Sequence, residues 1–115
     1  MKIQILNLIG ENCVTKEDGQ RLYELIHPEL AGNKQVELDF NGVNVFASLF
    51  FNAAIGQLLK DISSENLNAL LKFTNLPSTG MDVLKRVIKN AKAYYTDPKA
   101  REASDEILNS QSEEK

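Results

Sequence analysis

Three polar side chains near the middle of the chain, Asp39, Ser48 and Asn52, are of types that could do chemistry. A carboxylate, a hydroxyl and an amide could line a small pocket. A phosphate on Ser48 would lie at the start of an expected helix, where negative charge is tolerated. We favour simpler roles: Asp39 accepts a hydrogen bond in the turn at Asn41-Gly42, and Ser48 is the N-cap of its helix. Asn52 could equally lie on the solvent side of that helix.

Cys13 and His27, the single cysteine and the single histidine, could in principle form a nucleophile–base pair. About twelve helical residues between them would put the two side chains roughly 18 Å apart, which is too far for such a pair. The chain has no phosphate-binding loop, dinucleotide motif or zinc motif. We therefore expect no cofactor, no metal and no enzymatic activity. A lone cysteine also fits a reducing, cytoplasmic setting.

Composition and charge are those of a single globular domain, which we place at residues 1–108, with a flexible tail at 109–115. The 115 residues carry a net charge of -3, and no basic stripe predicts nucleic-acid binding. No apolar run approaches the roughly 18 residues of a membrane span. One basic cluster stands out, and it is more typical of a solvated helix face than of a site for an anionic partner. It comprises Lys85, Arg86, Lys89 and Lys92.

The hydrophobic pattern predicts strands and helices in alternation. In chain order we expect a strand at Lys2–Ile9, a helix after Thr15, a strand at Gln35–Phe40, an extended run at Val43–Phe46, a helix at Leu49–Lys60, a strand at Leu70–Leu76, a helix after Thr79 and a short helix at Lys99–Leu108. This order predicts an α/β domain: a mostly parallel sheet of three to four strands, with about four helices on its faces.

The first long helix has several local signals. Thr15 and Asp18 fit a capping box, and Thr79 with Asp82 fits a second one further along the chain. Gly19 indicates close approach of this helix to a strand, and Pro28 is expected to disturb its far end. Its apolar face is expected to comprise Leu22, Leu25, Ile26 and Leu30.

The helix Leu49–Lys60 is apolar nearly all round. A helix of that composition is buried on more than one side, and in so small a protein the second side could belong to a partner. One alternative that this leaves open is a homo-oligomeric structural subunit, a homodimer formed through this helix and the C-terminal helix. Another is a small enzyme with a pocket at Asp39, Ser48 and Asn52.

The stretch Val36–Leu59, VELDFNGVNVFASLFFNAAIGQLL, resembles the core of the STAS domain, which occurs in sulfate transporters and anti-sigma-factor antagonists. That family has an acidic residue ending a strand, a glycine turn, a second apolar run and a serine at a helix start. The matching positions here are Asp39, Gly42, Val43, Phe46 and Ser48. The earlier stretch LNLIGENCVTKEDGQRLYELI is similar to the family's first strand, turn and helix. Small STAS-like proteins of unknown function from bacteria and phages are especially similar.

The resemblance implies a STAS-like fold and a bacterial-type regulatory module that binds a protein partner. The partner would be a kinase-like ATPase or a regulator of anti-sigma type, bound through the strand-turn-helix 36–61. The contact residues would be Asp39, Asn41, Gly42, Ser48 and Asn52.

The helix start departs from the antagonist pattern. Antagonists begin this helix with Asp-Ser-Ser-Gly, and a partner kinase phosphorylates one of the serines. Here the run is Ala47-Ser48-Leu49-Phe50, so Ser48 matches the first serine and not the usual acceptor. Phosphorylation of Ser48 therefore stays a hypothesis. Some STAS domains bind nucleotides, but no residue pattern here supports a particular nucleotide site.

Overall fold

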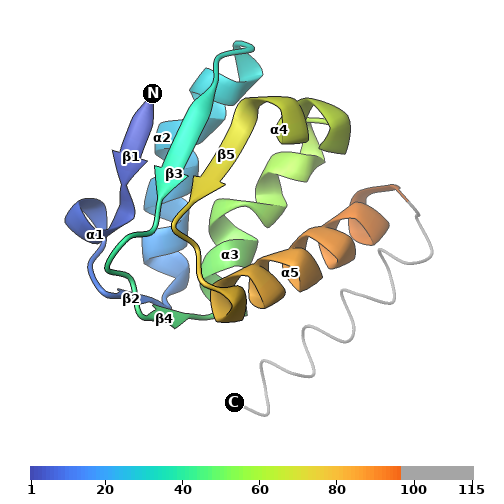
Figure 1. Ribbon diagram of the computed structural model, residues 1–115. Helices are drawn as coiled ribbons and strands as arrows, with labels where there is room; N and C mark the ends of the chain where they lie inside the picture. The colour runs from blue at the N-terminus through green and yellow to red at the C-terminus, as the bar shows by residue number, and fades with distance from the viewer. Residues whose placement is uncertain (97–115) are drawn as a thin grey trace.

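The computed structural model describes residues 1–96 (Figure 1). The elements are β1 (Lys2–Gln4), α1 (Ile5–Leu8), β2 (Asn12–Cys13), α2 (Lys16–Ala31), β3 (Val36–Asp39), β4 (Val45–Phe46), α3 (Ser48–Ala54), the 3₁₀ helix η1 (Gly56–Lys60), α4 (Ser64–Leu70), β5 (Leu71–Thr74) and α5 (Ser78–Thr96). The helix expected at Lys99–Leu108 and the tail expected at 109–115 lie outside the described residues.

The main sheet has three parallel strands in the order β1-β3-β5, which confirms the predicted α/β class. Its register places Ile3 beside Leu38 and Leu38 beside Phe73. β2 and β4 form a separate parallel pair in which Asn12 lies opposite Val45. The extended run at Val43–Phe46 therefore contributes to a second, smaller sheet and does not extend the main one.

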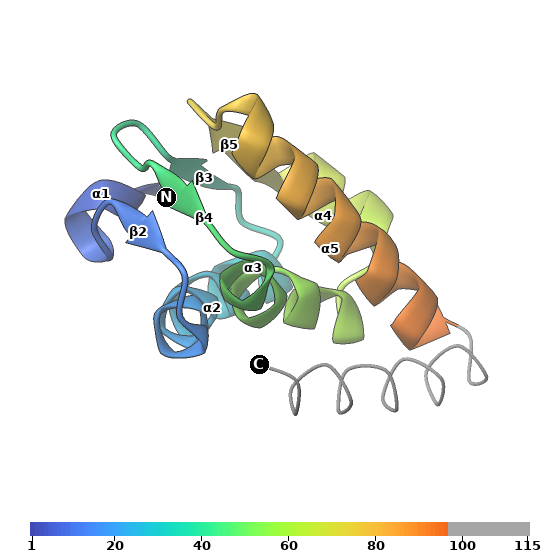
Figure 2. The same cartoon turned by 90° about the horizontal axis from the view of Figure 1, so that it is seen from below.

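Helices α2 and α3 lie on one face of the main sheet (Figure 2). In Figure 2 α2 and α3 lie together on one side of β3 and β5. The apolar row Ile3, Leu38 and Phe73 belongs to the core on that side. The neighbouring row Lys2, Glu37 and Lys72 is exposed or half-buried on the other side. Parallel sheets are normally covered on both faces, so this open face is unusual, and the polar alternation of the strands accounts for it.

The expected strand at Lys2–Ile9 is wrong beyond Gln4. Gln4 lies opposite Asp39, the last residue of β3, so later residues have no strand to pair with. Unpaired backbone groups must find other partners, and here they form the helical turn α1. Ile5 is fully buried by this bend, whereas Leu6 stays 39% exposed.

α2 begins as predicted and continues through the proline near its far end. The Thr15 hydroxyl accepts a hydrogen bond from the Asp18 N–H at 3.1 Å, which confirms Thr15 as the cap. The helix continues through Pro28 to Ala31, so Pro28 does not end it. Pro28 lies in the last turn, where a missing N–H costs one intrahelical bond at most. The expected apolar face is buried except for Leu25, which is 44% exposed.

The helix expected at Leu49–Lys60 is divided into α3 and the 3₁₀ helix η1. Its apolar side chains are covered by this chain's own elements, because α3 lies between α2 and α5 (Figure 2). The fully buried ones are Phe50, Phe51, Ala54, Ile55 and Leu58. No partner is needed to cover them, which corrects that expectation. The large apolar side chain that stays exposed here is Leu49, at 53%.

Gly19 marks a close approach, but to a helix and not to a strand. A Cβ atom on Gly19 would lie 2.4 Å from the Phe50 carbonyl oxygen on α3. The two backbones meet because residue 19 has no side chain. This contact fixes how deeply α3 lies against α2.

The last third of the described chain contains α4, β5 and α5, and both the strand and the long helix expected there are present. Ser63 caps α4 by accepting a hydrogen bond from the Asn66 N–H at 3.2 Å, and β5 lies within the strand expected there. α5 begins at Ser78, so the second capping box at Thr79 is wrong. Met81 N–H instead donates to the Pro77 carbonyl. None of the helices within residues 1–96 is long and apolar enough to cross a membrane.

Candidate functional site

The β4–α3 junction, residues 45–52, contains the serine that the sequence singles out. Ala47 and not Ser48 is the N-cap of α3, so the predicted capping role of Ser48 is wrong. The cause is the β2–β4 pair: Ala47 N–H donates to the Cys13 carbonyl at 2.9 Å and holds Ala47 extended. Ser48 is therefore the first helical residue, and its side chain is exposed.

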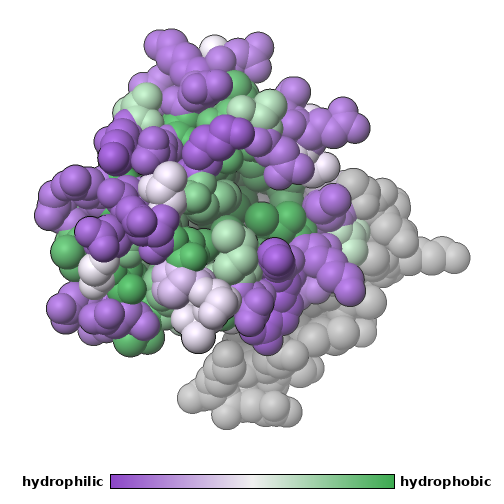
Figure 3. Space-filling model, in the orientation of Figure 1, coloured by the Kyte–Doolittle hydropathy of each residue, from purple (hydrophilic) through white to green (hydrophobic). Residues whose placement is uncertain are grey.

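Three exposed apolar side chains surround this junction, and we call them the apolar end. They are Val14, Val45 and Leu49, which are 37%, 46% and 53% exposed. Val14 directly follows β2, Val45 belongs to the paired strand β4, and Leu49 follows Ser48. In Figure 3 the lower left, over the region of α1, β2 and β4, shows hydrophobic patches interspersed with hydrophilic surface. Asn52 is also exposed, one turn into α3.

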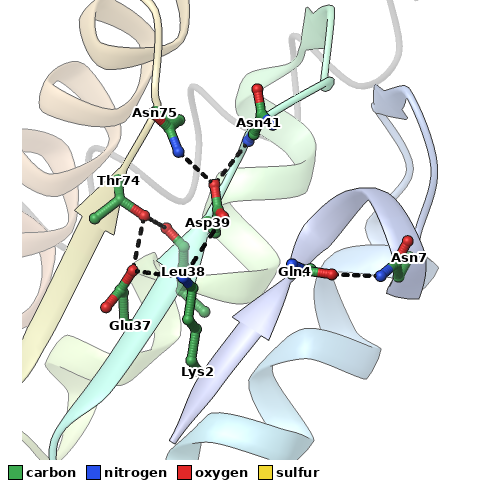
Figure 4. Close-up of polar contacts among 9 residues, drawn as sticks. All are labelled: Lys2, Gln4, Asn7, Glu37, Leu38, Asp39, Asn41, Thr74 and Asn75. Atoms are coloured by element: carbon green, nitrogen blue, oxygen red, sulfur yellow. Dashed lines mark hydrogen bonds and ion pairs between the residues drawn. The ribbon is translucent and has the colours of Figure 1, made fainter.

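Asp39 is the last residue of β3, before the turn that leads to β4. Its side chain joins the end of β3 to the end of β5 (Figure 4). Its Oδ1 accepts hydrogen bonds from the Asn41 N–H at 3.0 Å and from the Asn75 side-chain amide at 2.8 Å. Its Oδ2 is 4.0 Å from the Lys2 Nζ. The Asn75 amide, followed by the Asn41 N–H, holds the pKa of the Asp39 carboxyl below its usual value. Asp39 therefore has the predicted turn role and also ties the end of β3 to the end of β5.

Asn75 is the site residue that the sequence did not reveal. It follows β5 directly and has a positive φ of 56°, a conformation that asparagine adopts more readily than most residues. An asparagine placed just after a strand is the one signal available. Its partner Asp39 is far away in the sequence, and only the parallel pairing of β3 with β5 brings the two together.

The open face of the sheet carries further polar contacts beside Asp39 (Figure 4). Thr74 Oγ1 donates to Glu37 Oε2 at 3.1 Å, and Lys2 Nζ is 3.7 Å from the same oxygen. An open hollow of about 480 Å³ adjoins this network and is lined by Lys2, Gln4, Asn7 and Leu8. These polar groups bond to one another, since Asn7 Nδ2 donates to Gln4 Oε1. The network joins neighbouring strands across the sheet face.

The five predicted contact residues fall into two groups. Asp39, Asn41 and Gly42 form the turn after β3, where Gly42 has a φ of 87° and lies against Leu6 of α1. Ser48 and Asn52 lie on the exposed side of α3. The hydrogen bonds and ion pair of Asp39 go to Asn41, Asn75 and Lys2. No hydrogen bond or ion pair joins Asp39 to Ser48 or Asn52 within the described residues, and none of the three lines the hollow.

Cys13 and His27 do not pair. Burial, with a smaller effect of the Asp18 charge, raises the pKa of the Cys13 thiol to about 12, so the nucleophilic thiolate is suppressed. His27 Nε2 is 2.8 Å from Asp61 Oδ2, and its ring stacks on Tyr23. Among residues 1–96 no three His, Cys, Asp or Glu side chains are placed to hold a metal ion.

The main sheet is parallel and has helices on one face. The turn after β3 leads through β4 to the serine-bearing helix α3. Together these features define a small STAS-like α/β domain. The chain belongs to the family described as STAS-like domain of unknown function (DUF4325), whose match covers residues 18–81. That range runs from α2 to the first turn of α5 and includes Asp39 and the whole β4–α3 junction. No curated protein and no solved structure matches the chain significantly.

Proposed function

We propose that this protein is a non-catalytic regulatory module that binds a protein partner through the apolar end. The observation that carries the proposal is the exposure of Val45 and Leu49 on either side of Ser48. A cluster of exposed large apolar side chains is characteristic of protein-interaction surfaces. The other apolar residues of α3 are mostly buried, which makes Leu49 stand out.

The surface is also held rigidly, which favours binding because little conformational entropy is lost. Ala47 is fixed to β2 by the hydrogen bond to Cys13, and Phe50 and Phe51 anchor the first turn of α3 in the core. A partner would therefore meet Val45 and Leu49 in a preformed arrangement.

Ser48 offers a means of control. Phosphorylation there would add close to two negative charges between two apolar side chains and would oppose an apolar partner. By STAS likeness, the partner would be a kinase-like ATPase or an anti-sigma-type regulator in a bacterial cytoplasm. Since Ala47, Leu49 and Phe50 replace the antagonist's Asp-Ser-Gly residues, we propose that contact is the main role and phosphorylation a modulation of it.

Site-specific photo-cross-linking tests the surface. A photoreactive amino acid at residue 49 should capture one defined partner in cells of the source organism. The matched control is residue 25, because Leu25 is similarly exposed at 44% but lies on the side of α2. Equal capture at both positions, or no capture at residue 49, would overturn the proposal.

Charge substitution tests the control by Ser48. Ser48→Asp should weaken binding of the captured partner at least tenfold while leaving the fold intact. Ser64→Asp is the control, because Ser64 is likewise the first residue of a short helix but lies in α4. Unchanged affinity of the Ser48→Asp protein would remove Ser48 from the mechanism.

A homodimer is the alternative that the apolar end still allows. The helix first expected at such an interface is buried within its own chain, so a dimer would have to use Val14, Val45 and Leu49. Size measurement at low micromolar concentration separates the homodimer from the partner-binding module. A homodimer should become a monomer on Leu49→Lys substitution, whereas a partner-binding module should be a monomer with or without the substitution.

A further inference from the structure

The exposed side of α5 carries a concentrated positive charge that the proposed function does not use. Lys85, Arg86 and Lys89 are all exposed, and their spacing of three and four residues puts them on one side of the helix. We call these three residues the basic face. The only acidic residue of α5 is Asp82. The ion pairs among residues 1–96 involve other side chains, so no carboxylate there pairs directly with the basic face, and Asp82 offsets at most one of its three positive charges.

The negative charge of the chain is concentrated elsewhere. Residues 97–115 contain six acidic and three basic residues, so this segment alone accounts for the net charge of -3. Residues 1–96 contain ten of each sign and are balanced. Within 102–114 the sequence has five carboxylates and no lysine or arginine. The most acidic part of the chain thus follows directly after its most basic helix.

We propose that the basic face of α5 is the docking surface for residues 102–114 of the same chain. Lys89 lies about 10 Å back along the helix from Thr96, at 1.5 Å per residue. The connecting residues 97–102 can span up to about 20 Å, so the acidic segment can reach the basic face. Exposed charge pairs are individually weak, but a short tether gives the segment an effective concentration in the millimolar range.

The alternative occupant of a basic face is an external polyanion such as a nucleic acid. Binding of that kind is favoured by a broad excess of positive charge, and residues 1–96 have no net charge, with ten residues of each sign. A tethered carboxylate segment needs only the local charge of the basic face. In this arrangement the acidic segment would also screen α5 from other anions.

Zero-length carbodiimide cross-linking of the full chain tests the proposal, because it joins a lysine amine to a carboxylate only when the two are in contact. Lys85 or Lys89 should couple to Glu102, Asp105, Glu106, Glu113 or Glu114 at least fivefold more than Lys72 does. Lys72 is the matched control, since it is also exposed but lies on the open sheet face. The excess should vanish in 1 M salt, where screening acts over about 3 Å.

Two further measurements make the result decisive. In a mixture of ¹⁴N- and ¹⁵N-labelled protein the cross-links should stay within one isotope, and mixed links would overturn docking within one chain. Arg86→Glu retains both lysines and should lower their coupling several-fold, whereas Arg21→Glu on α2 should not. Equal coupling at Lys72, or insensitivity to Arg86→Glu, would overturn the proposal. Tight binding of a nucleic acid to the wild-type chain, lost in Arg86→Glu, would assign the basic face to that ligand instead.

Discussion

Gly19 on α2 lies so close to Ala53 on α3 that a Cβ atom at residue 19 would stand 2.8 Å from the Ala53 Cβ. The Phe50 carbonyl oxygen would be nearer still, at 2.4 Å. Real Cβ atoms do not approach other atoms so closely, and a backbone oxygen cannot turn away as a side chain can. The absence of a side chain at residue 19 therefore determines the spacing of the two helices beneath the sheet.

Gly19→Ala should destabilise the protein, although alanine is the better helix former by about 1 kcal/mol. The added methyl group must push α3 away from α2, and overpacking of this kind typically costs about 1–3 kcal/mol. Urea unfolding at neutral pH measures the effect. Gly56→Ala is the control, because the nearest atoms to its added Cβ would be 3.6 Å away. That variant should unfold within about 0.5 kcal/mol of the wild type.

Ser48→Ala should leave stability nearly unchanged, within about 0.5 kcal/mol, because Ser48 is not the N-cap of α3. Thr15→Ala should cost about 1 kcal/mol, since it removes the hydrogen bond that Thr15 accepts from Asp18 N–H. Chemical denaturation of the two variants side by side provides the comparison. A loss at Ser48 as large as the loss at Thr15 would mean that the helix begins one residue later than the structure shows.

Asp39→Asn should lower stability at neutral pH and have less effect in acid. The Asp39 pKa is lowered in the folded protein, so its carboxylate stabilises the fold above its unfolded pKa of about 3.9. That stabilisation is lost as the pH falls through the folded pKa, because the protonated carboxyl then accepts the same bonds less strongly. Unfolding measured at several pH values between 7 and 2 should show the wild type converging on the variant.

The control for Asp39 is Glu24→Gln, which changes an exposed carboxylate on α2. Its difference from the wild type should stay small at every pH. The free energy of unfolding of Asp39→Asn could instead differ from that of the wild type by the same amount at every pH. The hydrogen bonds from Asn75 and Asn41 would then stabilise the charged carboxylate no more than the neutral carboxyl.

Cys13 should react very slowly with iodoacetamide in the folded protein. A pKa raised from 9.0 to about 12 lowers the thiolate fraction about a thousandfold at pH 8, and full burial blocks the reagent as well. The unfolded chain in urea should react at the ordinary rate. A cysteine introduced by Ser48→Cys should be alkylated rapidly in the same folded sample, and mass spectrometry of the peptides separates the two sites.

The sequence predicts those parts of the fold that are encoded locally. The alternation of Glu37 and Asp39 with apolar neighbours predicts β3, and Thr15 predicts the start of α2. What it does not predict depends on distant partners. The apolar run from Ile5 to Leu8 reads as a strand, but β3 ends opposite Gln4 and leaves that run unpaired.

The candidate site shows the same limit. Ser48 has the residue type of a helix cap, yet the bond from Ala47 to Cys13 moves the cap one residue earlier. The sequence predicts Asp39 and Asn41 together because the turn joins them in sequence. Asn75 was not, because its link to Asp39 exists only after β5 pairs with β3.

The strands follow one another across the main sheet in the same order as along the chain, β1, β3 and β5 (Figure 1). Each new strand therefore joins an edge that is already in place, and no later strand has to be inserted between two earlier ones. The sheet can be assembled in the order in which a ribosome delivers it, from the N-terminus onward. β3 has the central position, so synthesis past Asp39 is the earliest point at which any pair of the main sheet can be complete.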